Sequence, residues 1–255
     1  AAPVILLPPS EGKVAGGEGP AVDWHGGVMG ALGDARLQVR DAVLRAIRTP
    51  SRAQKLLGVR GLHLQRALDE WAAIDDAPTL PAAHRYAGVV WGALAPGDME
   101  ARARRRLMQR VLVPSGLWGL VAATDPLPAY RLKMGATVPP LGLLSTWWRP
   151  SVTAALVARS GRGAVIDLLP NEHAAAIDWT AVRPGARVRV LVVDDGPGGR
   201  TVVGHAGKAL KGALARAILI GDARTAADVA ELRVDGLGPG AVEGDGGTVT
   251  FARRA

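Results

Sequence analysis

Four short apolar runs constrain the fold of this chain more than any other feature of its 255 residues. None of them alternates regularly between apolar and polar residues, which indicates strands that are buried on both faces of a sheet. The runs cover residues 3–7, 111–113, 164–168 and 188–193. Segments with the apolar spacing of helices separate them, such as 34–47, 83–94 and 213–220. We therefore predict an α/β fold: one compact domain over residues 1–255, with a mixed sheet and surrounding helices.

Composition excludes several classes of protein. The chain has no cysteine, so disulfides, thiolate metal sites and a cysteine nucleophile are excluded. No apolar run reaches the ~18 residues of a membrane span, and residues 1–7 are too short for a signal peptide. We therefore expect a cytoplasmic protein without a membrane partner. The net charge of +8 favours an anionic partner, although a GC-rich genome would also enrich the chain in arginine.

Residues 52–72 are predicted to form two short helices joined by a tight turn. The turn, Leu57-Gly58-Val59-Arg60-Gly61-Leu62, resembles that of a helix-hairpin-helix element, which binds DNA phosphates through backbone N–H groups without reading sequence. The alternative is a plain helical hairpin whose first helix ends on a glycine. A basic helix is predicted after Asp98, and its spacing places several arginines on one stripe of the helix surface. The candidate DNA-binding residues are Gly58, Arg60, Gly61, Arg102 and Arg106.

Polar loops follow the predicted strands, and ligands of open α/β sheets bind beyond the carboxyl ends of the strands. The first loop, residues 8–13, is not a P-loop, because it lacks the required glycine and Val14 stands where Ser or Thr is needed. Two prolines fix the path of residues 125–131. The candidate ligand- or phosphate-binding residues of these loops are Ser10, Lys13, Ser115, Trp118, Asp125, Tyr130, Arg131 and Asp167.

Residues 204–212 place one histidine and two lysines where a predicted strand runs into a helix. Backbone N–H groups and the helix dipole favour an anion there. Lys208 and Lys211 are three residues apart and share one helical face, so a phosphate would compensate two ammonium groups that the dipole repels. Lys211 therefore joins the phosphate-binding candidates. The alternative is a solvated basic helix start beside a core histidine, His205.

Six sequence blocks together resemble one family. They occur in the order Leu6-Leu7-Pro8-Pro9-Ser10-Glu11-Gly12-Lys13, Ala77-Pro78-Thr79, Arg85-Tyr86-Ala87-Gly88-Val89, Ser115-Gly116-Leu117-Trp118-Gly119, Pro128-Ala129-Tyr130-Arg131-Leu132 and His205-x-x-Lys208-x-x-Lys211-Gly212. The chain is thereby similar to the YaaA, or peroxide stress protein, family. The resemblance implies a compact α/β domain with a helix-hairpin-helix element and a basic cleft, binding of duplex or branched DNA, and a role in limiting DNA damage and free iron under peroxide. It ties no enzymatic activity firmly to the chain.

The chain departs from the family pattern near the predicted cleft. Gly204 stands where the family has a serine, Ala206-Gly207 where it has Phe-Asn, and Leu169-Pro170 where it has Arg-Ser. These changes remove one arginine and several polar groups. They indicate a divergent member, of actinobacterial type, that could have been recruited to another task.

Two functions remain open from the sequence, and a third is weaker. The first is DNA binding without sequence preference, by a monomer without a cofactor, through phosphates held in a basic cleft. The second is an enzyme acting on a nucleotide, nucleobase or related small molecule in the same cleft. Its catalytic candidates are Lys208 as an imine-forming amine, and His205 or Glu11 as acid/base. The third is a metal site built from Asp167, Glu172 and His173.

Overall fold

A computed structural model describes residues 1–196, 199–204 and 207–254. At its centre five strands run parallel, in the spatial order β12-β9-β8-β1-β3, and antiparallel strands complete the sheet at both edges. Strand β4 pairs with β3, β11 with β12, and β10 with β9. The bounds are β1 Val4–Leu6, β3 Val111–Ser115, β4 Gly119–Ala122, β8 Val165–Asp167, β9 Arg187–Gly196, β10 Gly199–Val202, β11 Leu237–Val242 and β12 Thr248–Arg253. The predicted mixed sheet of an α/β fold is thus confirmed.

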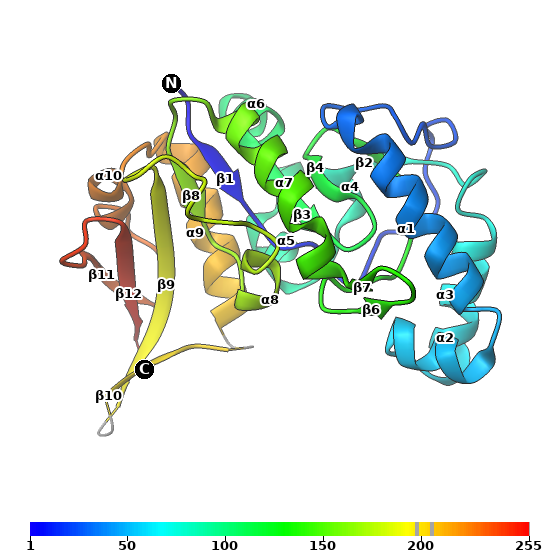
Figure 1. The fold of residues 1–255 in the computed structure, drawn as a ribbon. Coiled ribbons are helices and arrows are strands. Elements are labelled where there is room, and N and C mark those ends of the chain that lie inside the picture. The colour runs from blue at the N-terminus through cyan, green and yellow to red at the C-terminus, as the bar shows by residue number, and fades with distance from the viewer. Residues whose placement is uncertain (197–198, 205–206, 255) are drawn as a thin grey trace.

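The helices cover both faces of the sheet, and three of them form a group beyond one of its ends. Figure 1 shows α7 in front of the central strands, α9 behind them, and α1, α2 and α3 gathered at the end far from β9 and β12. The bounds are α1 Gly33–Ala46, α2 Pro50–Leu57, α3 Gly61–Ala72, α4 Ala82–Arg85, α5 Val89–Leu94, α6 Ala101–Arg110, α7 Leu144–Ser160, α8 Asn171–Ala174, α9 Gly207–Gly221 and α10 Ala226–Ala230. Within the described residues, none of these helices has the length and apolarity that a bilayer span requires.

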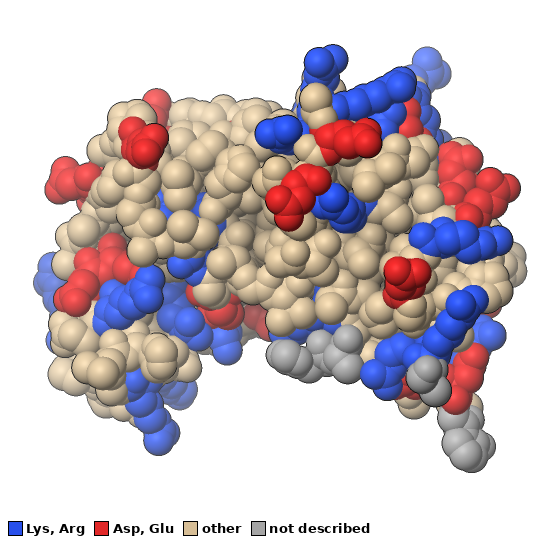
Figure 2. All heavy atoms as spheres, turned by 180° about the vertical axis from the view of Figure 1, so that it is seen from behind, with Lys and Arg blue, Asp and Glu red and all other residues tan. Residues whose placement is uncertain are grey.

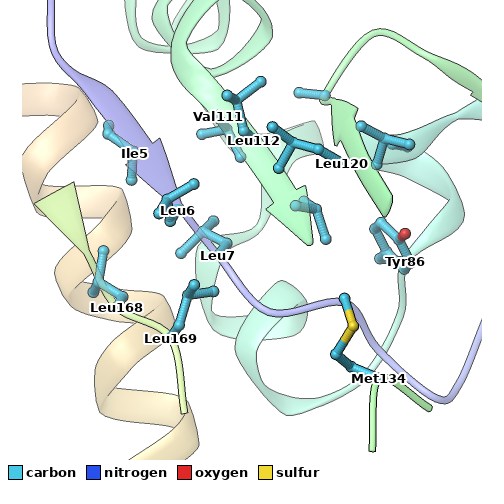
Figure 3. Close-up of a cluster of buried hydrophobic side chains, with 14 of the residues drawn as sticks. Ile5, Leu6, Leu7, Tyr86, Val111, Leu112, Leu120, Met134, Leu168 and Leu169 are labelled. Atoms are coloured by element: carbon cyan, nitrogen blue, oxygen red, sulfur yellow. The ribbon is translucent and has the colours of Figure 1, made fainter. Parts of the chain in front are cut away.

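The apolar runs of the sequence form the centre of the core. Ile5, Leu6 and Leu7 are fully buried, and Figure 3 shows them between Leu112 on one side and Leu168 on the other. Burial on both faces explains why these strands do not alternate between apolar and polar residues.

The helix predicted over 83–94 is interrupted, and this part of the prediction is wrong. The structure has α4 and α5 with Gly88 between them at φ +112°, a backbone conformation that residues with a side chain rarely adopt. The break turns α5 away from α4. Gly212 of α9 then packs so closely on α5 that a Cβ atom there would overlap the carbonyl oxygen of Val90. This close contact fixes the start of α9 beside the loop that follows β1.

The glycine-rich segment 14–33 is attached to the core by two buried guanidinium groups. Arg85 donates hydrogen bonds to the carbonyl oxygens of Val14, Gly16, Pro78 and Leu127. Arg36 makes a similar set of bonds, to Trp24, Gly26, Trp118 and Leu120. Since buried polar groups must be paired, each arginine satisfies carbonyl groups from several separate segments of the chain.

Candidate functional site

A pocket of about 760 Å³ lies beyond the carboxyl ends of β1 and β8. The loop after β1 forms one wall, the segment after β8 a second, and the start of α9 with β9 and β10 a third. The residues that carry its polar chemistry are Ser10, Glu11, Lys133, Asn171, Glu172, His173, Arg189, Lys208 and Lys211. Segments far apart in the chain therefore meet at one hollow, at the edge of the sheet where α/β proteins bind ligands.

The charges that line the pocket are mostly positive. Four cations, Lys133, Arg189, Lys208 and Lys211, face two carboxylates. Both carboxylates already have partners: Glu11 Oε2 lies 3.3 Å from a guanidinium nitrogen of Arg131, and Glu172 Oε1 accepts a 2.8 Å hydrogen bond from the amide of Gly135. The cations are therefore available to an anionic ligand.

The two lysines of α9 have different surroundings. Lys208 is exposed at the first turn of the helix, whereas Lys211, three residues later, is half-buried. Lys211 Nζ lies 3.3 Å from the carbonyl oxygen of Leu168, to which it donates. Burial lowers the pKa of Lys211; the carboxylate of Asp167 opposes this shift and the charge of Arg189 adds to it. One pocket thus holds a solvated ammonium group and a partly desolvated one.

His173 contributes a neutral imidazole to the pocket. Burial lowers its pKa to about 4, although the charge of Glu172 acts in the opposite direction. Its Nδ1 is buried and has no hydrogen-bond partner among the described residues. Sequence reasoning considered His173 only as a metal ligand. Its position just past the end of a buried strand was the signal that could have placed it at a ligand pocket.

A second polar cluster lies behind the loop after β1, outside the pocket lining. Lys13 Nζ donates to the carbonyl oxygen of Ser10 at 2.8 Å, and burial lowers the pKa of Lys13 to about 8. Three buried hydroxyl groups form a chain next to it: Ser115 Oγ lies 2.7 Å from the Tyr130 hydroxyl, which lies 2.8 Å from that of Tyr86. Tyr130 and Ser115 have almost no exposed surface, so they support the loop rather than contact a ligand in this conformation.

The other predicted ligand residues are engaged in the core. Trp118 is buried and stacks on Trp24 with ring centres 4.6 Å apart. The carboxylate of Asp125 accepts hydrogen bonds from backbone amides at 28 and 122. Asp167 is paired with Arg187 at 2.6 Å. His205, a candidate acid/base, lies outside the described residues.

The metal hypothesis has no geometric support in the part of the chain that the structure describes. Glu172 bonds to Gly135 and Asp167 to Arg187, and the described residues hold no group of three His, Asp or Glu side chains positioned around a common point for a metal.

The predicted DNA-binding residues fall into two groups. Gly58, Arg60 and Gly61 are exposed at the connection between α2 and α3, where both glycines have positive φ. A Cβ atom on Gly58 would lie 3.7 Å from Nζ of Lys133, so this connection borders the pocket. Arg102 is exposed on α6, away from it. Arg106 instead donates to the carbonyl oxygens at the end of α9, those of Leu219 and Ile220.

Fold and site together define an α/β protein with a pocket at the carboxyl ends of its parallel strands. Comparison with known proteins identifies the family: the family model described as Peroxide stress protein YaaA matches residues 4–239. A UPF0246 protein of Streptomyces coelicolor is 36% identical over 223 residues, covering 85% of this chain and 82% of its own. A UPF0246 protein of Corynebacterium glutamicum is 34% identical over 233 residues, covering 89% of each chain. The chain belongs to the YaaA peroxide stress protein family, as its sequence blocks predicted.

Proposed function

We propose that the chain binds a small, phosphate-bearing, nucleotide-like ligand in the pocket. The observation that carries this proposal is the pair Lys208 and Lys211 on the first turns of α9, facing a pocket that also receives Arg189 and Lys133. Its volume of about 760 Å³ is within the ~300–1,000 Å³ of small-molecule sites. The α9 dipole repels the lysines, so a phosphate there would be held by ammonium groups and helix N–H groups together.

The charge on one face of the molecule also favours a compact anion over a long polyanion. On the face that Figure 2 shows, Lys and Arg gather at separate places with Asp and Glu between them. A protein that binds duplex DNA mainly through its phosphates gathers lysines and arginines on one face or stripe.

Calorimetric titration with AMP, ATP and inorganic phosphate tests the proposal. We expect ATP and AMP to bind, and Lys208→Gln to weaken binding roughly tenfold, because a charge-assisted hydrogen bond contributes about 1.5–3 kcal/mol. Lys55→Gln, on the exposed side of α2, is the matched control and should bind as the parent does. Absence of binding at millimolar nucleotide, or equal weakening by both substitutions, would overturn the proposal.

DNA binding through the α2–α3 connection is the second candidate. It is supported by the exposure of Gly58, Arg60 and Gly61 and by Leu62, which is 88% exposed at the start of α3. Backbone N–H groups at such a turn can hold a phosphate of either strand without reading bases. Fluorescence anisotropy of labelled duplex and branched DNA against salt concentration tests it. A steep loss of affinity with salt supports this candidate, and no binding at low salt excludes it.

Membership in a peroxide stress protein family suggests that the ligand is bound when the cell is exposed to peroxide. We infer that binding in the pocket serves the response of the cell to peroxide. Cells that lack the chain should survive peroxide less well, and Lys208→Gln should restore survival less than Lys55→Gln does. Equal restoration by the two variants would separate the pocket from the stress response.

A further inference from the structure

The lysines of this chain are concentrated at one place. Only five of its 31 lysine and arginine residues are lysines: Lys13, Lys55, Lys133, Lys208 and Lys211. Three of them line the pocket, and Lys13 donates a hydrogen bond to the carbonyl oxygen of Ser10, which also lines it. Elsewhere the chain uses arginine for nearly every positive charge. An arginine binds phosphate at least as well as a lysine, but its guanidinium keeps its proton and is not used as a nucleophile.

The clustering of lysines at the pocket therefore indicates a requirement for amine chemistry. The surroundings of Lys208 and Lys211 suggest a different role for each of them. Lys208 is exposed at the rim of the pocket, which suits a phosphate clamp. Lys211 is half-buried, makes one hydrogen bond through Nζ to Leu168, and lies near Asp167. A partly desolvated lysine is the form that proteins use as a nucleophile, because burial favours the neutral amine.

We propose that Lys211 forms an imine with a phosphorylated aldehyde or ketone, whose phosphate is held by Lys208 and Arg189. The phosphate half of this proposal rests on the proposed function, whereas the amine half does not. The class of ligand includes phosphorylated sugars in their open-chain form, which carry both an anion for the clamp and a carbonyl carbon for the nucleophile.

The step balances without a further reactant. The lone pair of neutral Lys211 Nζ attacks the carbonyl carbon, and the π electrons of the C=O bond move to oxygen. The two protons of the amine leave with that oxygen as water, and a C=N bond replaces C=O. His173 lines the same pocket, and burial lowers the pKa of its imidazole so that the ring is neutral at pH 7; it can therefore carry a proton from nitrogen to oxygen.

Pyridoxal 5′-phosphate is a suitable probe, because it joins an aldehyde to a phosphate. The whole chain is incubated with it at a one-to-one ratio, reduced with borohydride and digested, and the modified lysines are mapped by mass spectrometry. We expect Lys211 to carry at least about tenfold more adduct than Lys55, since the clamp raises the local concentration of aldehyde. Pyridoxal, which lacks the phosphate, should modify Lys211 less.

Variants and competitors distinguish the two halves of the proposal. Lys211→Arg keeps the charge but should abolish the adduct, whereas Lys55→Arg should leave it unchanged; if Lys211→Arg does not fold, the map of the parent chain still decides. Adduct at Lys208, or spread evenly over the five lysines, would overturn the imine proposal even if nucleotides bind. If pyridoxal and pyridoxal 5′-phosphate modify Lys211 equally, and added inorganic phosphate does not reduce the modification, Lys211 is still a nucleophile but the phosphate clamp is overturned.

Discussion

The ammonium nitrogen of Lys13 lies 4.1 Å from the centre of the Tyr130 ring. The ring is held in place because its hydroxyl bonds to both Ser115 and Tyr86. A cation over an aromatic face is stabilised by the ring quadrupole, but the loss of hydration outweighs this, and burial lowers the pKa of Lys13 to about 8. The loop that lines the pocket therefore depends on a lysine that is only marginally protonated at slightly alkaline pH.

Stability should consequently rise with pH in the alkaline range. The pKa of Lys13 is about 8 in the folded chain and near its ordinary 10.5 in the unfolded chain, so the unfolded chain binds more protons between these values. The free energy of unfolding then increases with pH, by at most about 3 kcal/mol over the window. Ionisation of tyrosines in the unfolded chain limits the useful range to pH below about 10. Urea unfolding at several pH values measures the rise, which Lys13→Met should flatten and Lys55→Met should not.

Asp167 should matter more for stability than any exposed acid. Its carboxylate is only 1% exposed and is bonded to Arg187 at 2.6 Å and to the backbone amide of Leu169 at 2.9 Å. Removing one partner of a buried pair leaves an uncompensated charge, so Asp167→Ala should cost about 3–5 kcal/mol. Asp195→Ala breaks an exposed pair with Arg200 and should cost at most about 1 kcal/mol. Equal losses in thermal unfolding would mean that the Asp167 pair is not effectively buried.

Local patterns in the sequence determined the strands well but not their long-range contacts. The runs at 3–7 and 164–168 became β1 and β8 because burial on both faces excludes polar residues. The helix over 83–94 was mispredicted because its apolar spacing continues across Gly88, which adopts a positive φ. No local pattern shows that Arg36 and Arg85 bond to carbonyl groups of the segment 14–33, since these contacts exist only after folding.

The candidate site could be predicted in part. The sequence shows where the buried strands end, but it does not show in which direction the side chains of the following loops point. Ser10, Glu11, Lys208 and Lys211 meet at one pocket. Trp118 and Tyr130 lie in comparable loops but are buried, since their large rings contribute more by filling the core than by facing solvent. Arg189 was not singled out because it lies inside a strand, where alternation places it on the pocket side only once the register with β8 is known.

Two of the three arginines predicted to bind DNA, Arg60 and Arg106, should respond differently to substitution. Arg60 is exposed beside the α2–α3 turn, so Arg60→Ala should leave stability unchanged and, if this turn binds DNA, reduce the salt slope of binding by about one. Arg106 bonds to two carbonyl groups at the end of α9 and lies 3.5 Å from Asp222. Arg106→Ala should therefore destabilise the fold by about 1–3 kcal/mol. Fluorescence anisotropy measures DNA binding by both variants, and thermal unfolding measures their stability. If Arg106→Ala is as stable as the parent but loses DNA binding, the structural role of Arg106 is contradicted.

His173 should make the protein sensitive to mild acid. Its pKa is about 4 in the folded chain and 6.5 when unperturbed, so the unfolded chain binds more protons between these values. The free energy of unfolding must then fall as the pH decreases from 6.5 to 4, by at most about 3 kcal/mol. His173→Gln removes the titrating group and should flatten this part of the profile. His63→Gln, at an exposed position on α3, should keep the parent's profile. A ligand that hydrogen-bonds to Nδ1 of His173 should raise stability at neutral pH in the parent but less in His173→Gln, because this buried atom has no partner among the described residues. Chemical denaturation with and without AMP measures both effects, and a flat acid profile in the parent would show that water reaches the imidazole freely.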